Sequence, residues 1–435
     1  MVVSLTRGDT LYSMNPDELL QPASTMKLYT AALALDRLGA DHHFSTDVLR
    51  DGPMGPDGAV LGNLVLRGGG DPALSNRFLR GDANTPMALL AQLTEAAGVR
   101  RVTGDIIADA SAFEDRRVPE GWLTRYLQQG YAARVSALSL NENVMMVAVH
   151  PELAGAAARV VLEPASSAVT VTSNVRLVNG SRGGRITVGR SAPGAVEARG
   201  WIGSRSVVRR YGLVMEDPAT FAAGAFRDAL GARGITIDGS IRLGTAPSGA
   251  SKVASLPSPP LERLVSVMNR ESVNHFAELI FRNTARTHET LPEGSATAGA
   301  ALLRDFLIQK VGTDSNAVHA ADGSGLSTLD RTTSRALIQL LAYAHRAPWA
   351  ASFHASLPVA GESELLRTRM RSTVAHGNLH AKTGTTNSVI SLGGYVTAQS
   401  GEVLAFAFLY NGTDRWNARE TIDAMGVTLA GFVRE

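Results

Sequence analysis

The sequence predicts a mixed α/β domain that is built from both ends of the chain and interrupted by a large insertion. Three observations carry this prediction. The 435 residues exceed what one hydrophobic core normally serves. Strand-like segments stand near both ends, and strong helical patterns follow a proline-rich linker at residues 257–260. Between these parts, from residue 44 to about residue 253, short β-like runs and glycine turns replace the helical texture.

The interrupted domain is assigned to residues 1–46 and 253–435. Two short strands, 2–5 and 11–14, precede a helix from Ser24 to about Leu38, where apolar residues fall at helical spacing. The later predicted elements of this domain are helices at 261–269, 274–287, 295–311 and 334–345, a hairpin at 389–397 and 403–410, and a closing helix at 417–433.

The insertion is assigned to residues 47–163 and 217–252, with a small nested all-β domain at 164–216. Within the nested part, residues 169–214 alternate strand-like runs with turn signals and show no helical pattern. Residues 89–109 and 222–243 echo one another, since each gives a helix-like stretch, a glycine and a short strand. We expect these two segments to be paired halves of one domain that flank the β module.

The composition excludes several classes of protein. Charged residues are 19%, hydrophobic residues 44% and the net charge is +2, which is typical of a globular protein. No dense basic run with interleaved aromatics is present, so nucleic acid is not an expected partner. The absence of cysteine excludes disulfides and thiolate chemistry. The first residues do not resemble a signal peptide, so the chain is either cytosolic or given without its leader.

Two of the four lysines stand in short patterns that favour chemistry, in a chain with 38 arginines. An ammonium can lose its proton when desolvated, whereas guanidinium stays charged. In the run Ser24-Thr25-Met26-Lys27 a hydroxyl and an amine lie one helical turn apart, at a helix start that favours developing negative charge. This predicts a serine nucleophile with a lysine base. The alternative is a helix-capping serine beside a surface lysine.

Two further motifs are weak singly. Ser272-Val273-Asn274 could relay a proton and hold a substrate amide, or it could simply cap the helix that begins at Asn274. Lys382-Thr383-Gly384-Thr385 leads into a strand, where glycine lets a substrate backbone approach and the other side chains can hold a carboxylate.

Together, the three motifs in this order form the signature set of penicillin-binding proteins and serine β-lactamases. The chain further resembles the D-alanyl-D-alanine carboxypeptidase/endopeptidase family of class C low-molecular-mass penicillin-binding proteins, peptidase family S13. That resemblance covers nearly the whole chain and includes the runs at 66–72, 136–143 and 322–327. It implies a transpeptidase/β-lactamase-like domain of α/β (α+β) type, interrupted by an inserted domain with a further insert, which agrees with the boundaries above.

The resemblance also implies a role for each motif residue. Ser24 would be acylated by the penultimate D-Ala carbonyl, with Lys27 as the base and Ser272 relaying the proton to the departing amine. Asn274 would orient the acyl chain. The terminal carboxylate would be held by Lys382, Thr383 and Thr385, and the backbone N–H groups of Ser24 and Thr385 would form the oxyanion hole. Neither metal nor organic cofactor is expected.

Substrate-binding roles are further expected for Gly384, Trp122 and Leu326, although Trp122 is either a cleft wall or a core residue, and core is the usual outcome for Trp. The family often has an acidic residue shortly after this Trp, whereas here Arg125 or Tyr126 takes its place. A second departure is Thr328, where relatives can carry Arg. These departures leave the preference for a stem-peptide side chain open.

The expected partners are peptidoglycan stem peptides, with β-lactams as covalent inhibitors. A periplasmic or extracytoplasmic location follows, in which peripheral membrane association is open. Two rivals remain: a serine β-lactamase, and a catalytically silent wall-binding protein that keeps the fold. Two local alternatives are also weighed. His376 and His380 are interpreted as loop residues rather than a metal pair, and residues 322–327 either line the substrate groove or form a tight structural turn.

Overall fold

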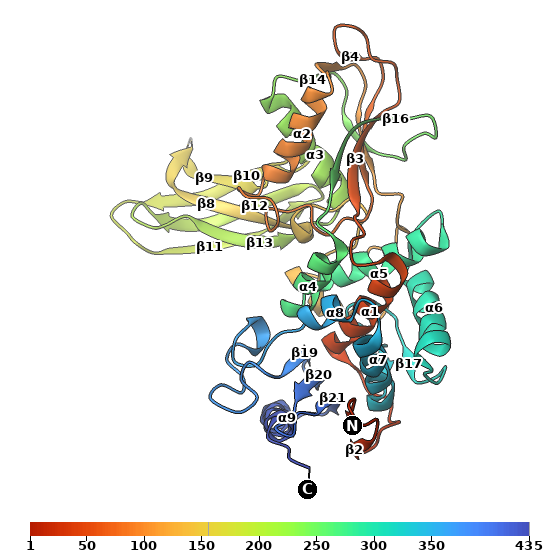
Figure 1. Ribbon diagram of the computed structural model, residues 1–435. Coiled ribbons are helices and arrows are strands. Elements are labelled where there is room, and N and C mark those ends of the chain that lie inside the picture. The colour runs from red at the N-terminus through yellow and green to blue at the C-terminus, as the bar shows by residue number, and fades with distance from the viewer. Residues whose placement is uncertain (155, 435) are drawn as a thin grey trace. The chain divides into compact units, whose positions relative to one another are not determined.

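The computed structural model describes residues 1–154 and 156–434, which form two compact units (Figure 1). The first unit comprises residues 1–43, 118–124 and 259–435, and the second comprises residues 44–117 and 125–258. The sequence prediction gave residues 118–124 to the insertion, whereas in the structure they cluster with the first unit. Several contacts join this segment to the first unit: the indole Nε1 of Trp122 donates to Asp322 at 2.7 Å, and Ser327 Oγ donates to the carbonyl of Glu120 at 2.7 Å.

A five-stranded antiparallel sheet in the first unit joins the two ends of the chain. Its strand order is β19-β20-β21-β1-β2. The pairing of β20 with β21 runs from Val389 opposite Asn411 to Thr397 opposite Val403, and Val2 of β1 pairs with Phe406 of β21. In Figure 1 the red first strands accordingly lie beside the blue last strands. The strand bounds are β1 Val2–Ser4, β2 Thr10–Tyr12, β19 His380–Thr385, β20 Val389–Thr397 and β21 Val403–Asn411.

Helices cover both faces of this sheet. Successive residues of a strand point to opposite faces: Leu392 belongs to a core cluster with Ile422 of the closing helix, whereas the next residue, Gly393, faces Leu28 and Leu337. The helices are α1 Met26–Leu38, α4 Leu261–Arg270, α5 Asn274–Glu289, α6 Ala296–Phe306, α7 Ser334–Arg346, α8 Ala350–Ala355 and α9 Arg415–Ala430. Short elements are the 3-10 turns η1 Ala23–Thr25 and η6 Glu364–Leu366, the π-helical turn η5 Leu307–Val311, and the paired strands β17 Val318–His319 and β18 Arg331–Thr332. Across residues 1–154 and 156–434, no helix combines the length and apolar character needed to cross a membrane.

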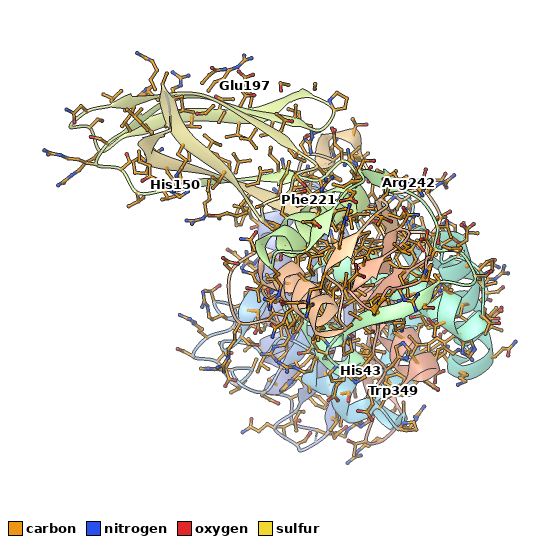
Figure 2. The ribbon with its side chains drawn as sticks, turned by 90° about the horizontal axis from the view of Figure 1, so that it is seen from above. His43, His150, Glu197, Phe221, Arg242 and Trp349 are labelled. Atoms are coloured by element: carbon orange, nitrogen blue, oxygen red, sulfur yellow. The ribbon has the colours of Figure 1, made fainter. Side chains whose placement is uncertain are left out.

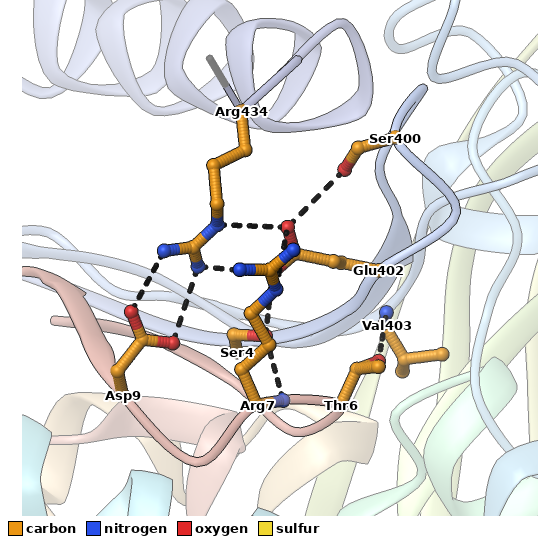
Figure 3. Close-up of polar contacts among 8 residues, drawn as sticks. All are labelled: Ser4, Thr6, Arg7, Asp9, Ser400, Glu402, Val403 and Arg434. Carbon is orange, nitrogen blue, oxygen red and sulfur yellow. Dashed lines mark hydrogen bonds and ion pairs between the residues drawn. The ribbon is translucent and has the colours of Figure 1, made fainter.

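Polar contacts also fasten the C-terminal segment to the first strands (Figure 3). The Arg434 guanidinium donates to both carboxylate oxygens of Asp9, at 2.9 and 3.1 Å, and to Glu402 at 3.0 Å. Ser4 of β1 donates to the same Glu402 at 2.7 Å. Backbone pairing and side-chain contacts thus join the two ends of the chain within this unit.

The second unit is built on another five-stranded sheet, of order β15-β7-β5-β3-β16, with a small sheet β14-β6-β4. The two echoing segments pair as expected: Thr236 lies opposite Arg101, and Ile241 lies opposite Ile106, both in parallel register. The bounds are β3 Ser45–Arg50, β4 Ala59–Val60, β5 Leu64–Gly68, α2 Thr85–Ala96, β6 Arg101–Val102, β7 Ile106–Asp109, α3 Pro218–Ala232, β14 Thr236–Ile237, β15 Ile241–Leu243 and β16 Ser251–Pro257.

The β module of the second unit consists of two three-stranded sheets, β10-β12-β11 and β13-β8-β9. No helix lies between residues 169 and 214, all of which the structure describes. Glu197 lies on β12 of this module, and Phe221 of α3 is buried in the core of the unit (Figure 2). Val149 of β8 shares a core cluster with Val175 of β10, so strands before residue 164 pack with the module. The strand bounds are β8 Val144–Ala154, β9 Ala157–Glu163, β10 Thr170–Val178, β11 Gly184–Ala192, β12 Ala195–Gly203 and β13 Arg209–Val214.

Candidate active site

Ser24 lies in the 3-10 turn η1, directly before α1. The predicted helix therefore begins two residues later than the sequence pattern indicated, at Met26. Lys27, in the first turn of α1, is fully buried, and its Nζ donates to Ser24 Oγ at 3.0 Å. Thr25 is the N-cap of α1 and makes no side-chain capping bond. The alternative of a helix-capping Ser24 beside a surface lysine is wrong, because the amine is inside the protein.

The Lys27 ammonium has three acceptors. Besides Ser24 Oγ, it donates to Asn274 Oδ1 at 2.6 Å and to the backbone carbonyl of Ser324 at 2.8 Å. Burial lowers the pKa of Lys27 to about 7, and the negative charges of Asp322, Glu278 and Asp330 offset only part of that effect. An amine with a pKa near neutrality is suited to take a proton from a neighbouring hydroxyl.

The Ser272-Val273-Asn274 motif lies between α4 and α5. Ser272 has a φ of 59°, a left-handed conformation that non-glycine residues rarely adopt. The N-cap of α5 is Val273, with no side-chain capping bond, so the alternative in which this motif merely caps the helix is wrong. Ser272 Oγ instead accepts a hydrogen bond from Lys382 Nζ at 2.9 Å. Each of the two motif lysines thus contacts one side chain of this motif.

The third motif forms the edge strand β19. Lys382 is fully buried, and its Nζ also donates to the carbonyl of Thr383 at 2.9 Å. Burial, followed by the charge of Lys27, holds the pKa of Lys382 well below its ordinary value. Thr383 is buried and Thr385 is exposed. The motif therefore presents one deep and one accessible hydroxyl along the same strand.

Gly384 allows β19 to pass directly beside the turn that carries the serine. A Cβ at this position would collide with Ser391 Oγ, would lie 2.8 Å from the carbonyl oxygen of Pro22 and would lie 3.0 Å from the backbone nitrogen of Ser24. Ser391 Oγ in turn donates to that Pro22 carbonyl at 2.7 Å. The protein itself fills the space next to Gly384, and this packing is a second reason for glycine besides the predicted approach of a substrate.

The loop at residues 322–327 is both a structural turn and part of the site. The buried carboxylate of Asp322 accepts from the backbone nitrogens of Ser324, Gly325 and Ser327, at 2.9, 2.6 and 2.8 Å. It also accepts from Trp122 Nε1 at 2.7 Å. The loop so fixed presents the Ser324 carbonyl to Lys27. Sequence reasoning weighed both interpretations of this loop and missed the central role of Asp322.

Trp122 and Leu326, the two additional predicted site residues, lie around this loop. Trp122 is 8% exposed, with its indole nitrogen bound to Asp322, and Leu326 is half-buried, with its backbone nitrogen 3.3 Å from Ser324 Oγ. His376 lies in a turn and His380 opens β19, so the two are not on one helical face. Within the described part of the chain, no group of three or more His, Cys, Asp and Glu side chains is placed to hold a metal ion.

A cavity of about 370 Å³ opens beside the motif residues. It is lined by Ser24, Ser272, Thr383 and Thr385, and also by Leu365, Arg369, Ile390, Arg415, Trp416 and Arg419. The first four belong to the predicted site. The arginines were missed, because they stand in no motif and a chain with 38 arginines gives no signal for three of them.

The comparisons with known proteins agree over nearly the whole chain. The model of the D-Ala-D-Ala carboxypeptidase 3 (S13) family matches residues 1–431. D-alanyl-D-alanine carboxypeptidase from Actinomadura sp. (strain R39) is 34% identical over 449 residues, which cover 99% of this chain and 81% of the relative. D-alanyl-D-alanine carboxypeptidase DacB from Haemophilus influenzae is 24% identical, over 94% of this chain and 84% of the relative.

Solved structures share the fold. Penicillin binding protein 4 (dacB) from Haemophilus influenzae matches with a TM-score of 0.79 at 23% identity, covering 95% of this chain and 90% of that one. The same protein complexed with a β-lactam matches with a TM-score of 0.76 at 21% identity, over 98% and 94% of the two chains. The predicted fold class, a transpeptidase-like α/β domain with inserted material, is confirmed by these likenesses.

Proposed function

The chain belongs to the D-Ala-D-Ala carboxypeptidase 3 (S13) family and is a serine DD-peptidase, and from this premise we propose how its own residues perform the reaction. The substrate is a peptidoglycan stem peptide, cleaved after a D-alanine through an acyl-enzyme on Ser24. One observation carries the proposal: a buried amine, Lys27 Nζ, lies 3.0 Å from Ser24 Oγ. Buried lysines with lowered pKa values are suited to act as general bases.

Acylation begins when Lys27 Nζ takes the proton from Ser24 Oγ, which attacks the D-Ala carbonyl carbon. The Oγ–C bond forms, the amide C–N bond breaks, and the proton held by Lys27 passes through Ser272 Oγ to the departing amine, so that Lys27 is neutral again. Lys382 supports this relay, because its Nζ donates to Ser272 Oγ at 2.9 Å. The leaving group is free D-alanine in the carboxypeptidase reaction and a cross-link amine in the endopeptidase reaction.

Developing charge on the carbonyl oxygen is stabilised by the backbone N–H groups of Ser24 and Thr385. The close passage of β19 beside η1 supports this pairing, since a Cβ on Gly384 would lie 3.0 Å from Ser24 N. We assign the terminal carboxylate to the hydroxyls of Thr383 and Thr385, with the buried Lys382 behind them.

Deacylation uses water. The water oxygen bonds to the acyl carbon, the ester bond to Ser24 Oγ breaks, and a proton from the water returns to that oxygen. Asn274 orients the acyl chain meanwhile, which is the role that the family resemblance implies, and Lys27 fixes its Oδ1 at 2.6 Å. Neither step requires a metal or organic cofactor.

We further propose that residues 1–46 and 253–435 act as the catalytic domain. Each reacting group assigned above lies in these ranges. The inserted residues 47–163 and 217–252, and the nested residues 164–216, supply no reacting group in this scheme. Trp122 is their contribution to the site, because it contacts the Asp322 loop and, with Leu326, would form the wall for the acyl side of the substrate. Because peptidoglycan lies outside the cytoplasmic membrane, we place the protein in the extracytoplasmic cell envelope.

The test is intact-protein mass spectrometry after incubation with benzylpenicillin, followed over time, together with release of D-alanine from a pentapeptide. We expect a single long-lived adduct on the wild type and none on Ser24→Ala. Ser248→Ala is the matched control, because Ser248 is exposed and lies in the second unit. That variant should form the adduct at the rate of the wild type.

Two results would contradict the proposal. Rapid drug hydrolysis without a persistent adduct would favour a serine β-lactamase. If the protein unfolds cooperatively on heating, and is therefore folded, but forms no adduct and hydrolyses no drug, the result would favour a catalytically silent wall-binding protein.

A further inference from the structure

The cavity beside Ser24 is larger than the scheme above needs. Its volume of about 370 Å³ is in the range of pockets that hold drug-sized ligands, whereas free D-alanine has a single methyl side chain. The serine and threonine hydroxyls line only part of it. The remaining lining includes Arg369, Arg415 and Arg419, which have no role in the chemistry assigned so far.

These arginines come from two segments of the first unit and differ in how they are held. Arg369, shortly after η6, is 6% exposed and donates through Nε to both oxygens of Asp423, at 3.0 and 3.1 Å. Arg415, the first residue of α9, donates through Nη1 to the carbonyl of Thr386 at 3.1 Å. Arg415 is thereby fixed next to Thr385, the residue assigned to the terminal carboxylate.

Arg419 is the least satisfied of the three. It lies half-buried, one turn after Arg415 on α9, and its side chain makes no hydrogen bond or ion pair within residues 1–154 and 156–434. Guanidinium groups in a partly buried position normally find a carboxylate or carbonyl partner. Its donors are therefore available to a bound molecule.

The placement of these charges is electrostatically unfavourable without a ligand. Arg415 and Arg419 are four residues apart, where like charges repel, and they occupy the N-terminal half of a helix, whose dipole disfavours cations. Asp423, which lies one turn after Arg419 on α9, is paired with Arg369. Asp414, at the N-cap, is engaged with Asn417, whose Nδ2 donates to it at 2.6 Å. An anionic ligand would relieve this arrangement.

The chemistry of the leaving group identifies that ligand. Free D-alanine carries one carboxylate, which the proposed function assigns to Thr383, Thr385 and Lys382. The amine-side peptide of a cross-link between two stem peptides carries a further carboxylate, beyond the one next to the scissile bond. Trp416, which is 72% exposed and lines the same cavity, offers an apolar surface to the part of the leaving peptide between its two carboxylates.

We infer that the cavity lined by Arg369, Arg415 and Arg419 binds the second carboxylate of an anionic leaving peptide, so that this chain prefers cross-linked stem peptides over substrates that release D-alanine. The inference rests on the proposed function. Ser24 Oγ forms its bond to the D-Ala carbonyl carbon, and the C–N bond to the cross-link amine breaks. The amine takes up a proton and departs as part of the peptide whose second carboxylate the arginines bind.

The experiment compares three substrates: a monomeric pentapeptide, a cross-linked dimer, and the same dimer with its distal carboxylate amidated. For the wild type, amidation should lower kcat/KM for dimer cleavage about tenfold, chiefly through KM, as loss of a charge-assisted hydrogen bond does. In Arg419→Gln the ratio of dimer to pentapeptide kcat/KM should fall about tenfold, and amidation should then have no further effect.

Arg304→Gln is the matched control, because Arg304 is an exposed arginine on α6 and does not line the cavity. It should keep the wild-type response to amidation. Two results would overturn the arginine subsite and leave the proposed function standing. In the first, the wild type releases D-alanine but amidation does not change kcat/KM for the dimer. In the second, Arg419→Gln shows the same effect of amidation as the wild type. If the wild type cleaves none of the three substrates, the proposed function is overturned together with the subsite.

Discussion

The indole nitrogen of Trp122 donates a hydrogen bond of 2.7 Å to the carboxylate of Asp322, across 200 positions of sequence. The same carboxylate accepts three backbone N–H groups of the loop at 322–327. That loop supplies the Ser324 carbonyl to Lys27. We therefore propose that Asp322 is a positioning residue for Lys27, the proposed base.

Asp322→Ala should lower both stability and activity. It leaves four buried or half-buried donors without their acceptor, so we expect a loss of about 3 kcal/mol in the free energy of unfolding. The rate of Ser24 acylation should fall more than tenfold, because the Ser324 carbonyl moves away from Lys27. Urea unfolding and the rate of benzylpenicillin adduct formation measure the two effects.

Trp122→Phe is the graded control for this prediction. It removes one of the four hydrogen bonds and keeps an apolar ring, so about 1 kcal/mol should be lost. An Asp322→Ala protein with wild-type stability, or a Trp122→Phe protein damaged as severely as Asp322→Ala, would contradict the role given to this carboxylate.

Acylation should rise with pH through about 7. Burial lowers the pKa of Lys27 to about 7, and only the neutral amine can accept the Ser24 proton. Below that pH the ammonium form dominates, so kcat/KM for D-alanine release should fall toward low pH and level off above neutrality. The measurement is a profile of kcat/KM from about pH 5 to about pH 9.

Lys27→Arg provides the contrast, because guanidinium keeps its proton throughout this range. Its kcat/KM should be lower by about 10³-fold at every pH, with no rise near neutrality. A wild-type profile that is flat between pH 5 and 9 would show that Lys27 does not act as the base.

Gly384→Ala should push β19 away from η1. The added Cβ would collide with Ser391 Oγ and would lie 2.8 Å from the Pro22 carbonyl oxygen. We expect a loss of about 2 kcal/mol in the free energy of unfolding and slower acylation of Ser24. Gly249→Ala is the control, since nothing lies within 4 Å of a Cβ there.

The double variant Gly384→Ala/Ser391→Ala separates the two collisions. Removing Ser391 Oγ relieves one of them and costs the hydrogen bond to Pro22. The double variant should therefore be destabilised by less than the sum of the single variants. Strict additivity, measured by urea unfolding, would show that the close approach at Gly384 is not limited by Ser391.

The three motifs could be recognised in the sequence because each is a short contiguous stretch of the chain. Ser24 and Lys27 are one turn apart, and Thr383 and Thr385 lie on the same face of β19, so local periodicity already brings each pair of side chains together. The pairing of β20 with β21 was predictable for the same reason, as a hairpin. Strand patterns at both chain ends indicated one domain built from both ends, but they did not specify that β1 pairs with β21.

The rest depends on contacts that no local pattern encodes. Asp322 meets Trp122 across the insertion, and Arg369 meets Asp423 through folding of the first unit alone. The 3-10 turn at Ser24 was also missed, and it packs closely against a distant segment: a Cβ on Gly325 would collide with the Ala23 carbonyl. Propensity gives no signal for such close approaches.

Glu278 tests whether the buried charges around Lys27 tune the base. Its carboxyl is fully buried on α5, where burial, and then the charge of Asp322, raise its pKa to about 8, and its Oε1 accepts from Gly323 N at 3.2 Å. The ionised form raises the pKa of Lys27. Glu278→Gln keeps an oxygen acceptor for Gly323 and mimics the neutral carboxyl. Because a carboxyl with a pKa of about 8 is largely neutral on the acid limb, where Lys27 titrates near 7, the acid limb of the kcat/KM profile should stay in place and the plateau above neutrality should stay within about threefold. A shift of the acid limb to lower pH would mean that Glu278 is ionised there and stabilises the Lys27 ammonium, and the electrostatic account of the base would have to be replaced.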